Sequence, residues 1–99
     1  MDSDKRKNER KELSEEVVLE FSSGTFETRI SDISLGGCYV DAIASVSEGE
    51  AISLTIAISQ ERSERFYGEV AYLLPGSGFG IRFTNLTDEN TDFLRQILS

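Results

Sequence analysis

The segment 32–37, DISLGG in one-letter code, combines residue types that could bind a polar ligand. In an extended chain, residues two positions apart project to the same face, so Asp32 and Ser34 can present their oxygens side by side. Gly36 and Gly37 lack a Cβ atom, which permits positive φ angles and the close approach of another surface. The segment thus offers an acceptor, a hydroxyl and bare backbone, which suits the edge of a planar polar ligand. The same residue types also form ordinary turns, the simpler interpretation of this segment taken alone.

The charge of the chain is divided between a basic beginning and an acidic body. The 99 residues carry a net charge of −8, yet residues 1–11 hold five of the ten basic side chains against three acidic ones. An acidic body disfavours duplex DNA, which proteins bind through many phosphate contacts. A short basic arm on such a body suits a small anion better, although a solvated tail would have the same composition.

Several classes of site are excluded by residue type. The chain has no His and a single cysteine, Cys38, whose flanking residues indicate a buried position in a strand. Without a His base, neither Cys38 nor Ser34 has the usual means of activation as a nucleophile, so we predict no catalytic residue and no enzyme activity. We also predict no metal site and no cofactor.

The sequence indicates a soluble protein of the cytoplasm. No apolar run approaches the roughly 18 to 20 residues of a membrane helix. The charged N-terminus lacks the apolar stretch of a signal peptide. We therefore expect a cytoplasmic domain with no membrane insertion.

Alternating apolar residues predict six short strands in one small domain. The expected strands cover residues 17–21, 25–31, 38–40, 53–59, 65–74 and 79–84, and turn residues separate them, such as Pro-Gly-Ser-Gly at 75–78. Residues 60–63 are expected to form a charged turn. Residues 1–15 have no apolar periodicity, so we expect a flexible N-terminal arm followed by one domain over residues 16–99.

The last segment, residues 88–98, changes to a helical period. Thr87 suits an N-cap, and acidic residues follow in the first turn, where the helix dipole favours them. The apolar residues fall on one face: Phe93, Leu94, Ile97 and Leu98. A helix of about 11 residues is not stable alone, so it should dock and close one open end. The predicted fold is all-β with a terminal helix, a six-stranded antiparallel β-barrel closed by a short C-terminal α-helix.

Two motifs give the chain a resemblance to a known family. The arm contains Arg6-Lys7-Asn8-Glu9-Arg10, two arginines four positions apart, and Asp32-x-Ser34-x-x-Gly37 follows downstream. In this order the motifs resemble the PilZ domain family, whose signature is RxxxR on an N-terminal arm and [D/N]xSxxG after the second strand of a six-stranded barrel. The last strand and the terminal helix also resemble that family, so the resemblance covers nearly the whole chain.

The resemblance implies a receptor for the bacterial second messenger cyclic di-GMP. Carried over by motif position, the arm ligands would be Arg6 and Arg10, and the barrel ligands would be Asp32, Ser34 and Gly37. Three further residues are weaker candidates beside them: Lys5 for a phosphate contact, Gly36 next to Gly37, and last Arg82, since an exposed strand arginine is usually only solvated.

The chemistry of these residue types fits that ligand. An arginine fork can satisfy the O6 and N7 acceptors of guanine, and guanidinium groups also stack on bases and pair with phosphates. A carboxylate such as Asp32 can accept from the N1 and N2 hydrogens of guanine, a donor pair that adenine lacks. The hydroxyl of Ser34 adds a short contact.

We expect the ligand to order the arm on the barrel and an unidentified effector protein to recognise the changed surface. The resemblance suggests motility or biofilm regulation as the output. The alternative is a nucleotide-independent protein-interaction adaptor on the same barrel. One or two cyclic di-GMP molecules per chain, and a monomer or a dimer, are all compatible with the sequence.

Overall fold

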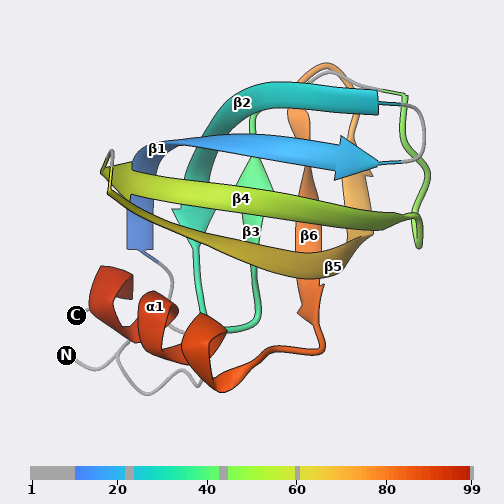
Figure 1. Ribbon diagram of the computed structural model, residues 1–99. Coiled ribbons are helices and arrows are strands. Elements are labelled where there is room, and N and C mark those ends of the chain that lie inside the picture. Colours follow the sequence, from blue (N-terminus) through green and yellow to red (C-terminus); the bar gives the residue numbers. More distant parts are fainter. Residues whose placement is uncertain (1–10, 22–23, 43–44, 60, 99) are drawn as a thin grey trace, which may run out of the picture.

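The computed structural model describes residues 11–21, 24–42, 45–59 and 61–98. Its elements follow one another as β1 Lys11–Phe21, β2 Gly24–Ile33, β3 Gly37–Val40, β4 Ala51–Ser59, β5 Arg62–Leu74, β6 Gly78–Thr84 and α1 Asp88–Leu98. The strands pair antiparallel in the order β1-β2-β3-β6-β5-β4, and pairing of β4 with β1 closes the barrel (Figure 1). The predicted six-stranded barrel with a C-terminal helix is confirmed.

Strand alternation builds the core, because the described side chains of β1, β4 and β6 point alternately into and out of the barrel. Val17 and Leu19 of β1 lie opposite Ile56 and Leu54 of β4, and all four side chains are buried. Cys38 is buried in the same cluster, as its strand context predicts. Burying each such aliphatic side chain is worth about 1.5–3 kcal/mol, so this alternation supplies much of the stability of the fold.

Aromatic contacts dock α1 against one end of the barrel, below the strands in Figure 1. The ring of Phe66 stacks on Phe83 at a centroid distance of 5.0 Å and meets the edge of Phe93 from α1 at 5.9 Å. Phe93, Leu94 and Ile97 are all buried. The helix thus buries the apolar face that its sequence spacing predicts, and it closes this end of the core.

The N-terminus of α1 is capped by reciprocal hydrogen bonds. Thr87 Oγ1 accepts from the amide of Asn90 at 3.0 Å, and Asn90 Oδ1 accepts from the amide of Thr87 at 3.2 Å. This arrangement is a capping box with Asn at the third position, and it confirms Thr87 as the N-cap. The side chain of Asn90 also donates to Glu64 Oε2 at 2.6 Å and to the carbonyl of Arg65 at 2.9 Å, which ties the helix start to β5.

Two strands, β1 and β5, begin at least three residues earlier than the apolar pattern predicts. β1 begins at Lys11, so residues 11–15, expected in the arm, belong to a strand that pairs with β2 as far as Ile33. β5 begins at Arg62, inside the expected charged turn. Strand pairing uses backbone groups, and polar side chains are accommodated on the outer face of a barrel, so apolar periodicity misses such ends. A register shift between Glu12 and Glu15 marks a β-bulge in this first part of β1.

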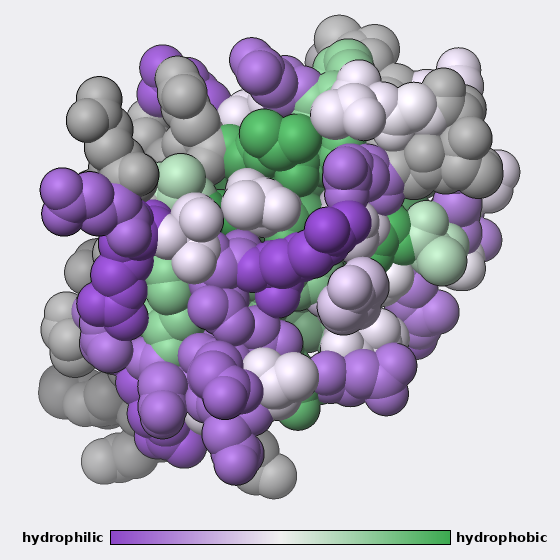
Figure 2. All heavy atoms as spheres, in the orientation of Figure 1, coloured by the Kyte–Doolittle hydropathy of each residue, from purple (hydrophilic) through white to green (hydrophobic). Residues whose placement is uncertain are grey.

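The outer face of the barrel is largely polar. Figure 2 shows hydrophilic side chains over most of the face formed by β4, β5 and α1, with hydrophobic ones visible between them. Within the described ranges, no helix has the length and apolar character needed to span a bilayer.

Candidate ligand-binding site

The DISLGG segment forms the end of β2, the turn to β3 and the first residue of β3. The amide of Ser34 donates to the carbonyl of Gly37 at 2.8 Å, and the amide of Gly36 donates to Ser34 Oγ at 3.2 Å. The hydroxyl of Ser34 is also 3.4 Å from the carbonyl oxygen of Gly37. The serine side chain therefore holds the turn together, in the manner of an ST-turn.

The side chain of Ser34 is not exposed beside Asp32. β2 ends at Ile33, and Ser34 is only 4% exposed. Asp32 is half-buried, and its Oδ1 atom is buried. β2 ends at Ile33, between the two residues, so the i, i+2 rule for an extended chain does not apply to Ser34. The turn therefore combines a carboxylate at the strand end with a hydroxyl engaged by the turn backbone.

Gly37 has a packing role that its position in the motif did not reveal. It pairs with Arg82 of β6, and a Cβ atom at Gly37 would lie 2.0 Å from the carbonyl oxygen of Ile81. Gly36 is half-buried, and its carbonyl accepts from the amide of Phe83 at 2.9 Å. Both glycines thus fasten the turn to β6. The motif alone does not indicate this role, because the contacting residue belongs to β6, which is far away in the sequence.

Strand register places residues of three neighbouring strands beside the turn. Glu12 of β1 and Tyr39 of β3 lie on either side of Asp32. Arg82 of β6 lies opposite Gly37, is 64% exposed and forms an ion pair with Glu69 of β5. A cationic side chain therefore borders the turn from the β6 side. The predicted arm ligands, Arg6 and Arg10 with Lys5, lie outside the described residues.

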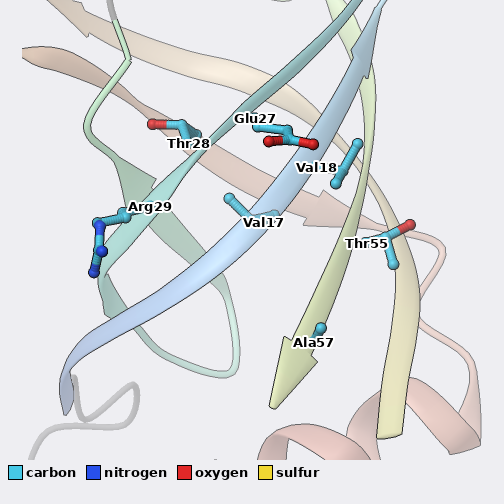
Figure 3. A pocket seen from close by; sticks show the side chains of 7 residues that line it. All are labelled: Val17, Val18, Glu27, Thr28, Arg29, Thr55 and Ala57. Carbon is cyan, nitrogen blue, oxygen red and sulfur yellow. The ribbon is translucent and has the colours of Figure 1, made fainter. Parts of the chain in front are cut away.

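A pocket of about 330 Å³ lies on the barrel wall between β2, β1 and β4. Glu27 lies over β1 beside Val18, whereas the guanidinium of Arg29 extends away from them (Figure 3). The pocket is lined by residues of three adjacent strands: Val17, Val18, Glu27, Thr28, Arg29, Thr55 and Ala57. Arg29 is three residues before Asp32 on the same strand, but no residue of the turn lines this pocket. No sequence pattern distinguishes these residues, because they occupy ordinary positions of alternating strands.

A second hollow of about 380 Å³ lies over β4, β5 and the end of β6. Its acidic group is already engaged. Glu20 Oε1 accepts from Ser53 Oγ at 3.1 Å and from the Arg65 guanidinium, which lies 5.8 Å from the centroid of the Tyr67 ring. The turn at 32–37 carries the DxSxxG motif and lies opposite Arg82 of β6, so it is the stronger candidate for ligand binding.

Solved structures with the same fold are bacterial proteins. The inhibitor of motility MotI from Bacillus subtilis matches with a TM-score of 0.78 and 19% identity, covering 93% of this chain and 48% of that one. The PilZ domain of YcgR from Escherichia coli, solved with c-di-GMP, matches at 0.76 and 18%, covering 93% and 87%. The PlzA protein of Borreliella burgdorferi, also in complex with c-di-GMP, matches at 0.69 and 20%, covering 95% and 41%.

The chain thus spans about half the length of MotI and of PlzA and most of the YcgR domain. No curated protein matches the chain. At these identities the structural likeness concerns the fold. The sequence itself, however, matches the family model described as the PilZ domain over residues 4–99, a range that includes both motifs. The chain belongs to the PilZ domain family.

Proposed function

We propose that this domain is a cyclic di-GMP receptor, a binding module rather than an enzyme, that acts in the cytoplasm. Arg6 and Arg10 of the arm and Asp32 of the barrel bind the nucleotide. Ser34, Gly36 and Gly37 shape the turn on which it lies, and Lys5 adds a phosphate contact. The bound nucleotide orders the arm on the barrel, and an effector protein recognises the ordered state.

One structural observation carries this proposal: β1 starts beside the motif turn. Lys11 pairs with Ile33, and Glu12 pairs with Asp32. The residue before Lys11 in the sequence is Arg10, the second arginine of the RxxxR motif. The strand that follows the arm therefore starts next to the carboxylate with which the arm would share a ligand.

The charges of the two parts suit a guanine dinucleotide. Arginine forks bind the O6 and N7 edge of guanine and the phosphate oxygens, while a carboxylate accepts from N1 and N2. Arg82 supplies another cation on the β6 side of the turn, although its ion pair with Glu69 competes for it. Ordering the arm costs about 1–2 kcal/mol per residue, so binding needs several such charged contacts.

Calorimetric titration of cyclic di-GMP tests the proposal. We expect saturable binding by the unmodified domain and affinity at least about tenfold lower for Arg6→Ala and Arg10→Ala, since each loses charge-assisted contacts. The titration also counts one or two nucleotides per chain. Cyclic di-AMP should bind far more weakly, because it lacks the N1 and N2 donor pair.

Arg95→Ala is the matched control, because Arg95 is an exposed arginine in the last turn of α1 and its loss changes the net charge equally. Amide exchange of residues 5–10 should slow when nucleotide saturates the unmodified domain. If the unmodified domain shows neither heat nor a change in melting temperature, the receptor proposal is wrong. The nucleotide-independent adaptor on the same barrel then takes its place.

A further inference from the structure

The β5–β6 hairpin ends in consecutive exposed apolar residues. Tyr72, Leu73 and Leu74 are 40%, 37% and 49% exposed, and exposed Pro75 follows them in the turn. We call these four residues the apolar tip. Single exposed apolar residues are ordinary on a protein surface, whereas several that gather at the end of one hairpin suit an interaction site. In Figure 1 the hairpin rises at the end of the barrel opposite α1.

The exposure follows from the strand pairing. Pairing of β4 with β5 ends at Ala51 and Glu69, whereas β5 continues to pair with β6 as far as Leu74 and Gly78. The last residues of β5 thus pair with β6 on one side and have no β4 partner on the other, so this part of β5 is an edge of the sheet. Proteins usually place charges, often Lys, on such edges to prevent unwanted contacts. Apolar residues in all these positions indicate a surface that contacts another protein.

The apolar tip is held in one conformation. The Tyr72 ring lies against Gly80, where an added Cβ would be 2.3 Å from the ring, and it stacks on Tyr39 at a centroid distance of 6.2 Å. Tyr39 Oη is 2.7 Å from Ser77 Oγ, and the amide of Ser77 donates to the carbonyl of Leu74 at 2.9 Å. A preorganised surface loses little conformational entropy when a partner binds, which favours affinity.

Acidic residues border the apolar tip. The amide of Gly49 donates to the carbonyl of Val70 at 2.7 Å, and the amide of Val70 donates to the carbonyl of Glu50 at 3.0 Å, so the loop with Glu48 runs beside β5. Asp41 directly follows Val40, which pairs with Phe79, itself the partner of Leu73. Residues 41–61 and 66–81 contain no Lys or Arg. The rim is therefore negatively charged.

We propose that the apolar tip is a docking surface for a protein partner that presents an apolar patch bordered by Lys and Arg. Apolar contact at the tip supplies affinity, and the acidic rim selects the basic border and accelerates association. The same rim disfavours a second copy of this acidic chain as the occupant. This surface does not depend on the nucleotide site, so either proposal can fail without the other.

Two synthetic helical peptides with the same leucine face test this surface, one with Lys and one with Glu on its polar face. Each is titrated into the isotope-labelled domain without nucleotide, and the amide signals are followed by NMR. The Lys peptide should shift signals of residues 72–77 and 48–50, and the Glu peptide should leave them unchanged. Leu74→Ser should lower the affinity for the Lys peptide about tenfold, because the complex loses part of the apolar contact of one buried leucine.

Leu86→Ser is the matched control, because Leu86 is a comparably exposed leucine, 38%, away from the hairpin. It should leave the response to the Lys peptide unchanged. Absent binding, shifts that map to another surface, an equal response to both peptides, or equal effects of the two substitutions would each overturn the proposal. A dimer detected by light scattering that Leu74→Ser dissociates would assign the apolar tip to a second copy instead, which also contradicts it.

Discussion

A Cβ atom on Gly37 would lie 2.0 Å from the carbonyl oxygen of Ile81, because β3 and β6 pair closely at the end of the motif turn. The last glycine of the [D/N]xSxxG motif therefore has a structural function in this chain that needs no ligand. The contacting atoms belong to the backbone of β6, which cannot move aside as a flexible side chain would. Gly37 joins the motif turn to the barrel wall.

Gly37→Ala should destabilise the domain in the absence of nucleotide. Overpacking of a core costs about 1–3 kcal/mol, and a contact with backbone belongs at the upper end of that range. Urea unfolding without ligand measures the effect. Thr25→Ala, an exposed site on β2, is the control and should change the unfolding free energy little. Unchanged stability of Gly37→Ala would leave ligand contact as the reason for this glycine.

Ser34→Ala should also lower stability without nucleotide, by about 1–2 kcal/mol. The nearly buried hydroxyl accepts the amide of Gly36, and its removal leaves that donor without its partner in the turn. Chemical unfolding of the ligand-free domain measures this loss. Ser45→Ala removes a hydroxyl from an exposed loop position and serves as the control. If Ser34→Ala reduced nucleotide affinity but left stability unchanged, the hydroxyl would act on the ligand alone.

Apolar alternation predicted the six strands, and the change of period near Thr87 predicted the helix and its cap. These features depend on residues close together in the sequence. The packing of Gly37 on Ile81 and the contact of Asn90 with Glu64 could not be predicted, because each depends on which strands become neighbours after closure of the barrel. The polar start of β1 at Lys11 was missed for a related reason: its pairing with β2 leaves no apolar pattern.

Asp32→Asn should separate recognition from folding at the candidate site. The amide has nearly the shape of the carboxylate, but one of its two polar atoms is a donor, so it cannot accept from both guanine N1 and N2. Under the proposed function, affinity for cyclic di-GMP should fall by about tenfold to a hundredfold, the usual value of a charge-assisted hydrogen bond. Calorimetry of both cyclic dinucleotides should show a smaller preference over cyclic di-AMP. Equal affinity of the variant and the unmodified domain would remove Asp32 from the site.

Asn90→Ala should loosen α1 from the barrel. Asn90 is 3% exposed, and its side chain accepts from the amide of Thr87 and donates to Glu64 Oε2 and to the carbonyl of Arg65. Its removal leaves the carbonyl of Arg65 without this donor and removes one of the two hydrogen bonds of the capping box. We expect a loss of about 2–3 kcal/mol, which a decrease in the urea midpoint would report.

A double-mutant cycle with Thr87→Ala separates the two functions of Asn90. The side chain of Thr87 contributes to the cap, where Oγ1 accepts from the amide of Asn90, so the coupling between the two substitutions measures the capping box. The remainder of the Asn90→Ala effect belongs to the tie between α1 and β5. Asp92→Ala, at an exposed helix position, is the control. If Asn90→Ala cost no more than Thr87→Ala, the contacts with β5 would contribute nothing, and the buried apolar face of α1 alone would hold the helix.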